Sequence, residues 1–320
     1  MIFSAFVKRG WGLLFEQYYL CLDVGGTEIK VNLLNSDKTP FYAENIRYES
    51  KAQKDKKSIL QHFKSIVTEH IQLMNAKGAE LLGIGIAFPG PFDYENGISL
   101  MKGIRKYDAL YQINLKEIMI QWIVELGFSH TTQLVFENDA TSFAEGEYYY
   151  GEARGKNKGM FITLGTGCGS TFIKNNLIIK NEYGLNQAGM IYDVPFLAGT
   201  IDEYLSAKGL MDIARANHMT NPDGYQLFLA AERGDNIARS IFREFGGQVA
   251  EGLQPFILSF EPDVVVLGGQ ISQSLKWMID GIGEQLTKNG GKIPLICKTA
   301  DTSLATLKGL VKNLENKNRL

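Results

Sequence analysis

Two glycine-rich turns, one in each half of the chain, carry residue types that bind phosphate. Each lies between two apolar runs, which is typical of the tip of a β-hairpin. Because glycine has no Cβ, backbone N–H groups at such a tip can approach an anion closely, and a threonine hydroxyl adds a donor. The first turn provides Asp23, Gly25, Gly26, Thr27 and Lys30, and the second provides Gly165, Thr166 and Gly167. We expect the two turns to hold one nucleoside triphosphate between them.

Two residues of the first turn have more than one interpretation. Asp23 precedes the Gly-Gly pair by two residues, where its carboxylate can hold Mg²⁺ through water beside the phosphates. The alternative is a turn-forming aspartate that binds its own backbone. Lys30 is either a phosphate partner or a strand lysine that points to solvent. The turn is not a Walker A loop, which would read GxxxxGK[ST] and open a helix.

A further glycine pair follows another apolar strand. Gly268 and Gly269 come directly after residues 264–267. A glycine pair after a strand is usually only a turn. In the company of two phosphate turns, we interpret this pair as an adenosine contact, since side chains there would block a flat base and its ribose.

The candidate catalytic residue is Asp139. With Asn138 it closes an apolar strand and opens a predicted helix, so helix capping alone would account for both residues. Phosphoryl transfer needs a carboxylate that orients and deprotonates the attacking hydroxyl, and Asp139 lies between the two phosphate turns in the sequence. Asn138 offers both a donor and an acceptor to a sugar hydroxyl. Capping and catalysis are compatible, and we predict that Asp139 is the general base.

The elements that must position these residues occur in two similar rounds. Each begins with a phosphate-type hairpin and continues with alternating helices and strands, which indicates a duplicated α/β unit with a ligand cleft between two lobes. The first round is expected to hold a hairpin at 18–34, helices ending at 77, 126 and 149, and strands at 81–88 and 133–137. The second is expected to hold a hairpin at 160–179, helices at 201–216, 238–259 and 304–316, and a strand at 264–267.

Composition excludes several classes of protein. The 320 residues carry a net charge of −2, whereas nucleic-acid-binding domains are usually basic, so we expect no nucleic-acid partner. No apolar run reaches the ~18 residues of a membrane span, so we expect no membrane partner. The three cysteines are far apart in sequence and lack a CxxC pair, which favours free thiols and a cytoplasmic location.

Five stretches together resemble the ROK family (repressor, open reading frame, kinase) of sugar kinases. They are LDVGGTEIKVNLL at 22–34, GIGIAFPGPFD at 83–93, FENDA at 136–140, ITLGTGCGSTFI at 162–173 and VVVLGGQIS at 264–272. The resemblance implies an α/β protein with the actin/hexokinase ATPase fold, in which two RNase H-like lobes enclose the active-site cleft. It also implies a homodimer.

The same resemblance implies a reaction. ATP with Mg²⁺ would donate its γ-phosphate to a hexose hydroxyl, commonly at C6, in a glucokinase-like kinase. Asp139 would be the base, and Pro89, Gly90 and Asn138 would contact the sugar.

The chain departs from the ROK pattern after the second hairpin, where the family carries an ExGH motif and then a cysteine-rich zinc loop. Gln187 and Met190 stand at the positions of that glutamate and histidine. Asp202 stands where the family has another glutamate, which contacts the sugar. The zinc loop is missing and no histidine lies near a cysteine, so we expect no zinc. We assign Gln187 and Asp202 to the sugar site.

This departure leaves the substrate open. Met190 offers only a thioether and apolar contact, which favours a sugar substituted at C1 or C2, such as a β-glucoside or an N-acetylhexosamine. The alternatives are a catalytically weak sugar-sensing regulator and another enzyme of the same fold, such as an acetate kinase-like protein or an ATPase. Polyphosphate in place of ATP is a further alternative for the phosphoryl donor. Tyr107 is most simply a core or surface tyrosine, with stacking on an aglycone as the alternative.

We divide the chain into three parts. Residues 1–17 form an N-terminal extension. Residues 18–132 form a small lobe, joined by a C-terminal helix at 304–320, and residues 133–303 form a large lobe.

Overall fold

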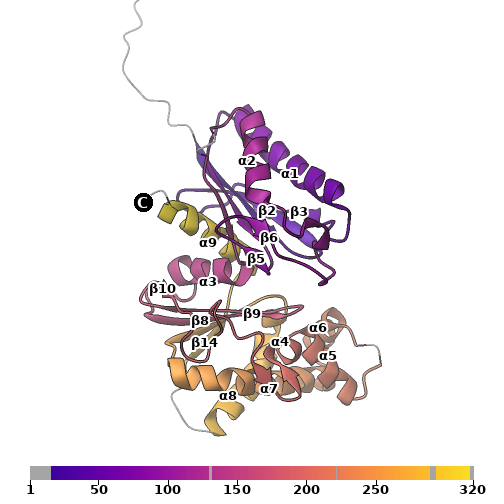
Figure 1. Cartoon of the computed structure of the whole chain (residues 1–320). Coiled ribbons are helices and arrows are strands. Elements are labelled where there is room, and N and C mark those ends of the chain that lie inside the picture. The colour runs from indigo at the N-terminus through magenta and orange to yellow at the C-terminus, as the bar shows by residue number, and fades with distance from the viewer. Residues whose placement is uncertain (1–15, 130–131, 221, 289–292, 318–320) are drawn as a thin grey trace, which may run out of the picture.

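Two five-stranded sheets, one from each half of the chain, organise the molecule (Figure 1). The computed structural model describes residues 16–129, 132–220, 222–288 and 293–317. Most of the predicted extension, residues 1–15, and the last three residues of the predicted C-terminal helix lie outside them. Helices lie on the faces of both sheets, so the expected α/β architecture is confirmed.

The first sheet has the order β3-β2-β1-β4-β7. β1 (Gln17–Val24) and β2 (Glu28–Asn35) form an antiparallel hairpin, and β3 (Ile46–Glu49) continues it beyond β2. β4 (Glu80–Ala87) lies parallel to β1, and β7 (Leu134–Glu137) lies parallel to β4. β7, which the predicted division at residue 132 places with the large lobe, thus pairs within the first sheet.

The second sheet repeats this plan in the order β10-β9-β8-β13-β14. β8 (Lys158–Leu164) and β9 (Cys168–Lys174) form the antiparallel hairpin, and β10 (Leu177–Ile178) follows it. β13 (Val264–Gly268) lies parallel to β8, and β14 (Leu295–Lys298) lies parallel to β13. Both sheets therefore consist of a hairpin extended by two parallel strands, which confirms the two predicted rounds.

Alternate residues of β1 face different helices, as the two-residue period of a strand requires. Leu20 and Leu22 pack with α1 (Lys56–Ala76) in one core, which also includes α2 (Leu115–Glu125). Cys21 faces the opposite side of the sheet and packs against α9 (Thr302–Lys317). The first sheet is therefore buried on both faces.

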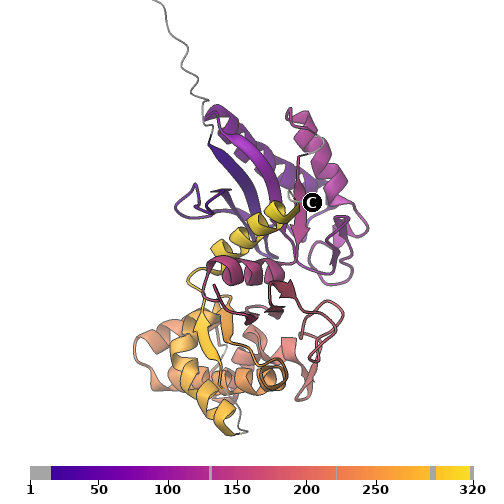
Figure 2. The same ribbon diagram turned by 90° about the vertical axis from the view of Figure 1, so that its left-hand side faces the viewer.

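Two helices lie between the sheets, α9 against the first and α3 (Asp139–Tyr150) against the second (Figure 2). Their backbones touch. A Cβ on Gly146 of α3 would overlap the carbonyl oxygen of Ala305, and one on Gly309 of α9 would overlap that of Ser142. Glycine at both positions is what allows this approach.

One expected helix is interrupted. Residues 201–216 form α4 (Ile201–Tyr204) and α5 (Ala207–Ala216) rather than one helix. The N–H of Ala207 donates to the carbonyl oxygen of Gly165, at 2.7 Å, instead of continuing the helix. This bond ties the start of α5 to the tip of the second hairpin.

The remaining elements are mostly short. They are β5 (Phe92–Asp93), β6 (Ile98–Ser99), β11 (Pro195–Phe196), β12 (Gly199–Thr200), the 3₁₀ helices η1 (Asp108–Leu110) and η2 (Ile271–Ser274), and the helices α6 (Gly224–Glu232), α7 (Asn236–Phe260) and α8 (Leu275–Lys288). α7 and α8 bury apolar residues against the outer face of the second sheet.

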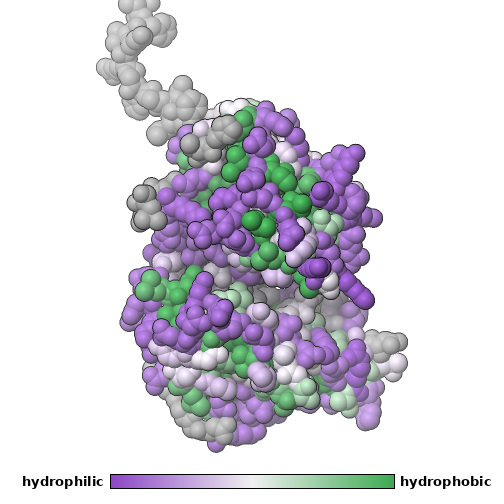
Figure 3. Space-filling model, viewed as in Figure 1, coloured by the Kyte–Doolittle hydropathy of each residue, from purple (hydrophilic) through white to green (hydrophobic). Residues whose placement is uncertain are grey.

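The surface is mainly hydrophilic on the face drawn in Figure 3, and a hollow lies between the upper and lower halves. Within the described residues, no helix combines the length and apolarity that a membrane crossing demands. Cys21, Cys168 and Cys297 are free, as predicted.

Candidate active site

Asn138 links the end of β7 to the start of α3. Its Oδ1 accepts hydrogen bonds from the N–H groups of Ala140 and Thr141, at 2.9 and 3.1 Å, so it caps the helix as the simpler interpretation predicted. Its Nδ2 donates to the hydroxyl of Tyr94 at 3.2 Å. A side-chain hydrogen bond from Asn138 also lowers the pKa of Asp139, so the amide of Asn138 faces both the tyrosine hydroxyl and the candidate base.

Asp139 is the first residue of α3 and its side chain is accessible to solvent. The surrounding protein nevertheless reduces the hydration of the carboxylate and raises its pKa, while the charge of Lys106 and the N–H of Ala140 oppose this rise. An accessible carboxylate with a raised pKa has the properties of a general base.

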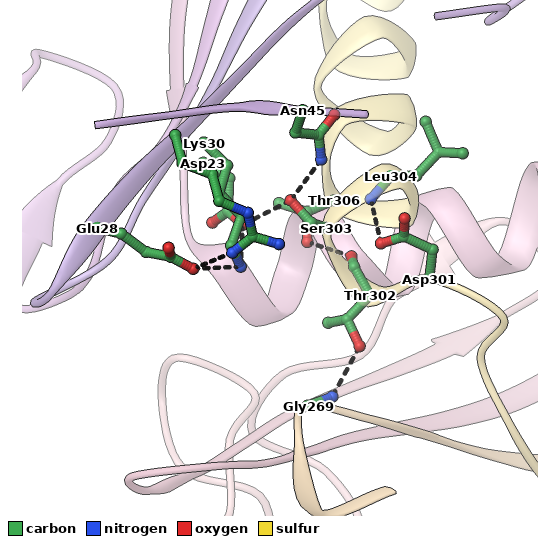
Figure 4. Close-up of polar contacts among 11 residues, drawn as sticks. Asp23, Glu28, Lys30, Asn45, Gly269, Asp301, Thr302, Ser303, Leu304 and Thr306 are labelled. Carbon is green, nitrogen blue, oxygen red and sulfur yellow. Dashed lines mark hydrogen bonds and ion pairs between the residues drawn. The ribbon is translucent and has the colours of Figure 1, made fainter. Parts of the chain in front are cut away.

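Asp23 lies near Asp139, although the two come from different elements. Desolvation raises the pKa of Asp23, the charge of Lys30 lowers it, and the negative charge of Asp139 raises it further. Oδ2 of Asp23 accepts a hydrogen bond from the hydroxyl of Ser303 at 3.1 Å (Figure 4). Two carboxylates that repel one another in one site favour a cation or a proton between them.

Lys30 forms ion pairs within its own hairpin. Its Nζ lies 3.7 Å from Oδ2 of Asp23 and 3.5 Å from Oε1 of Glu28 (Figure 4). The lysine is half-buried, so it does not simply point to solvent. It neutralises part of the charge of Asp23.

The first glycine turn is a tight hairpin tip. The N–H of Gly25 donates to the carbonyl oxygen of Glu28 at 2.9 Å, which closes the turn. Gly26 and Thr27 are exposed at the tip. The hydroxyl of Ser50 donates to the carbonyl oxygen of Gly26 at 2.6 Å, so a neighbouring loop supports the tip.

The second glycine turn lies against the start of α3. A Cβ on Gly169 would lie 2.8 Å from Cβ of Ala140, the residue after Asp139. The N–H of Gly165 closes the turn on the carbonyl oxygen of Gly167 at 3.0 Å, and Thr166 is exposed at the tip. The fold therefore brings the second turn to the candidate base.

Asp202 has a structural contact beside the second turn. Its Oδ1 accepts the N–H of Cys168 at 2.7 Å and lies next to Gly167. One oxygen of this carboxylate is therefore used to hold the hairpin, and its contact with a sugar stays a prediction.

Gly268 and Gly269 are explained by packing. A Cβ on Gly268 would lie 2.6 Å from the ring of Phe143, and one on Gly269, which has a φ of 83°, would overlap the backbone of Leu164. The N–H of Gly269 donates to Oγ1 of Thr302 at 2.8 Å (Figure 4). Their predicted contact with adenosine remains a prediction.

Tyr94 belongs to the candidate sugar site although sequence reasoning missed it. Its hydroxyl accepts from Asn138 and donates to the carbonyl oxygen of Phe88 at 3.0 Å. It also lies beside Gly90, where a Cβ would be 3.3 Å from the hydroxyl oxygen, while the adjoining Pro89 is buried. Tyr94 thus joins the predicted Pro-Gly turn to Asn138. No sequence pattern distinguishes it from an ordinary loop tyrosine.

The loop that replaces the ExGH motif is anchored to itself and to β9. Oδ1 of Asn186 accepts the N–H groups of Ala188 and Met190, both at 2.9 Å, and the N–H of Ile191 donates to Oγ of Ser170 at 3.0 Å. Gln187 is exposed. In the described part of the chain, the hydrogen bonds of this loop do not connect it to Asn138 or Asp139.

Tyr107 is a core residue, so stacking on an aglycone is wrong for it. Its side chain is fully buried, and its hydroxyl donates to the carbonyl oxygen of Gly25 at 3.0 Å. Its neighbour Lys106 is a second residue that sequence reasoning missed, because only the fold brings it to the first glycine turn.

Metal ligands are sparse. Among the residues described, no three His, Cys, Asp or Glu side chains gather in a group that could hold a metal ion. Asp23 offers carboxylate oxygens, which fit a Mg²⁺ ion that draws most of its ligands from water and phosphate.

Comparisons with known proteins show the family of this chain. The ROK family model matches residues 19–292. The glucokinase of Thermotoga maritima is 24% identical over 275 residues, covering 79% of this chain and 82% of that protein. The N-acetyl-D-glucosamine kinase of Haemophilus influenzae is 23% identical over 273 residues, covering 79% and 84%.

A solved structure shares the fold. The ROK family glucokinase of Streptomyces griseus, determined in complex with glucose and AMPPNP, superposes with a TM-score of 0.74 at 20% identity, covering 93% of this chain and 99% of that one. The two lobes are thus those of the actin/hexokinase fold. Because the ROK family model matches most of the length of this chain, the chain belongs to the ROK family.

Proposed function

We propose that the protein is an ATP-dependent sugar kinase that transfers the γ-phosphate of ATP to a hexose hydroxyl, with Asp139 as the general base. The position of Asp139 carries this proposal. It is an accessible carboxylate at the start of α3, with Asp23 of the first hairpin nearby and the second hairpin packed against Ala140. The similar proteins from Thermotoga maritima and Haemophilus influenzae, both named as sugar kinases, support it.

In the proposed reaction, the two glycine turns hold the phosphate chain and Gly268 and Gly269 border the adenosine. The sugar hydroxyl attacks the γ-phosphorus, and its proton passes to Asp139 as the new P–O bond forms. The bond from the γ-phosphorus to the bridging oxygen breaks, and ADP leaves. Bound Mg²⁺ supplies charge neutralisation of the phosphates, and Asp23 is the residue that would hold it through water.

The sugar is proposed to lie against Pro89, Gly90 and Asn138, with its C6 hydroxyl toward Asp139. The amide of Asn138, which already faces Tyr94 and Asp139, would meet a sugar hydroxyl placed between those two residues. Gln187 and Asp202 are proposed to border the sugar site. Met190 is proposed to supply an apolar contact at the position where the ROK family carries the histidine of its ExGH motif. We propose a sugar with a substituent at C1 or C2, such as a β-glucoside or an N-acetylhexosamine.

A coupled assay of ADP release tests this function. The panel is glucose, mannose, fructose, their N-acetylamino forms and β-glucosides such as cellobiose, each with ATP and Mg²⁺. Turnover with one class identifies the substrate. A wide preference for free glucose in kcat/KM would contradict the substituted sugar, and the absence of turnover with ATP binding intact would point to a regulator.

The role of Asp139 is tested separately. We expect D139N to lower kcat by about 10²–10⁴-fold, while calorimetry shows nucleotide binding close to that of the wild type. The matched control is D37N, because Asp37 is exposed and lies on a hairpin loop away from the site. Activity of D139N within a few-fold of the wild type would rule out Asp139 as the base.

A further inference from the structure

Lys106 lies across the tip of the first glycine turn. A Cβ built on Gly26 would be 2.9 Å from Cε of Lys106 and 3.3 Å from its Cδ. The stem of the lysine therefore occupies the space that a side chain at Gly26 would need.

The charge of Lys106 also reaches Asp139. It is the largest electrostatic influence that lowers the pKa of that carboxylate. The stem of Lys106 thus contacts the first phosphate turn, and its charge acts on the candidate base. These are the two groups between which a γ-phosphoryl group must pass on its way to a sugar hydroxyl.

The loop around Lys106 is built to hold it there. Arg105 and Tyr107, its two neighbours, both have left-handed backbone conformations, with φ of 58° and 57°. Such conformations are costly for residues other than glycine and persist where the surroundings enforce them, often at functional sites. The strain on both sides of one lysine points to a required position for that lysine.

Hydrogen bonds enforce this conformation. The carboxylate of Asp108 accepts the N–H groups of Ile104 and Arg105, both at 3.1 Å. The N–H of Tyr107 donates to the carbonyl oxygen of Ala52 at 2.8 Å, and its buried hydroxyl donates to that of Gly25. The loop is therefore fastened to the same hairpin whose tip Lys106 covers.

We propose that Lys106 is a catalytic residue that binds the γ-phosphate and stabilises the transferring phosphoryl group. This inference rests on the proposed kinase function. As the bond to the bridging oxygen of ADP breaks and the bond to the sugar oxygen forms, negative charge on the phosphoryl oxygens is met by the ammonium group. The proton of the sugar hydroxyl goes to Asp139.

Three variants test the catalytic role by steady-state kinetics. K106M should lower kcat by about 10²–10³-fold, with little change in the KM for the sugar, and K106R should recover much of the loss. The matched control is K102M, because Lys102 is an exposed lysine of the same loop whose Nζ lies over the ring of Tyr111. Wild-type kcat in K106M would overturn the proposal.

The pH profile gives a readout that a purely structural role would not move. Removing a cation next to Asp139 raises the pKa of that carboxylate, so the acid limb of kcat should move to higher pH in K106M and return in K106R. The other ionisable groups near Asp139, which are Asp23 with its partner Lys30 and the hydroxyl of Tyr94, are the same in both variants.

Nucleotide binding without sugar separates the two proposals. Calorimetry with AMPPNP and with AMP should show that K106M loses about tenfold in affinity for AMPPNP, as expected for one charge-assisted contact, and little for AMP. If the wild type phosphorylates no sugar but shows this difference, the sugar-kinase proposal fails and the phosphate contact stands. Equal affinities in wild type and K106M would overturn the contact, with circular dichroism as the check of folding.

Discussion

The hydroxyl of Ser303 donates a hydrogen bond to Oδ2 of Asp23 at 3.1 Å, although the two residues are 280 positions apart in the sequence (Figure 4). The same hydroxyl accepts from Nδ2 of Asn45 at 3.1 Å. Thr302, the preceding residue, accepts the N–H of Gly269 from the other half. The first turn of α9 therefore contacts the phosphate hairpin of one half and the glycine pair of the other.

Replacing Ser303 with alanine should weaken the use of MgATP. The lost hydrogen bond favours the charged form of Asp23, so its already raised pKa should rise further and a proton should compete better with Mg²⁺. A hydrogen bond worth about 0.5–1.5 kcal/mol corresponds to a roughly 2- to 10-fold higher KM for MgATP.

We expect this increase in the KM for MgATP to be larger at pH 6 than at pH 8, with an unchanged KM for the sugar. S303T keeps the hydroxyl and serves as control, and an equal increase in both variants would contradict the role of the hydroxyl.

Replacing Gly309 with alanine should destabilise the contact between α9 and α3. The new Cβ would overlap the carbonyl oxygen of Ser142, so the helices must separate. Such overpacking typically costs about 1–3 kcal/mol, which thermal or urea unfolding measures. The control is G283A, because a Cβ on Gly283 of α8 meets no atom within 4 Å. That change should stabilise by about 0.5–1 kcal/mol. A neutral G309A would show that the close approach is dispensable.

Glu145 should make stability depend on pH. It is buried near Glu137, and the amide of Asn313 donates to both carboxylates, at 2.6 Å to Glu145 and 3.5 Å to Glu137. Burial, and then the charge of Glu137, raise the pKa of Glu145 to about 8. The folded chain thus holds a proton that the unfolded chain has already released, so stability falls as the pH rises from the ordinary glutamate range to about 8.

The variant E145Q removes this dependence, since an amide does not ionise. Each pKa unit of the shift corresponds to about 1.4 kcal/mol, so the stability of E145Q relative to the wild type should increase between pH 5 and pH 8. Urea unfolding at several pH values measures it. Glu44 is exposed, and E44Q should follow the wild type throughout. Parallel curves for E145Q and the wild type would show that Glu145 has an ordinary pKa.

Removal of divalent metal should affect turnover and leave the fold intact. Treatment with EDTA should abolish phosphoryl transfer, and added Mg²⁺ should restore it, because the phosphates need a cation beside Asp23. The thermal unfolding midpoint should stay the same, since we expect no structural zinc. A large drop in that midpoint after chelation would indicate a structural metal.

Local patterns in the sequence were enough to predict the parts of the site that are local in structure. A glycine- and threonine-rich tip between two apolar runs favours a tight hairpin, and the structure has one at each predicted place. Asn138 before Asp139 has the residue type that caps a helix, and it caps α3. The final helix, predicted at 304–316, lies at Thr302–Lys317.

Tertiary structure alone decided which distant residues meet. β7 belongs to the first sheet because it pairs with β4, and the break between α4 and α5 depends on a bond to Gly165. The placement of Lys106 over Gly26 depends on how a loop packs onto a hairpin about 80 residues earlier, as in the Tyr107 to Gly25 hydrogen bond.

The physical reason is the range of each interaction. Turn geometry, helix caps and the two-residue period of a strand arise between near neighbours, so the sequence by itself determined the two glycine turns, the cap at Asn138 and the position of the candidate base. The hydrogen bond from Ser303 to Asp23 and the contact of Lys106 with Gly26 join residues that are far apart in the sequence. They form only when α9 and the loop that carries Lys106 pack against the first sheet, and no local sequence pattern predicts that packing.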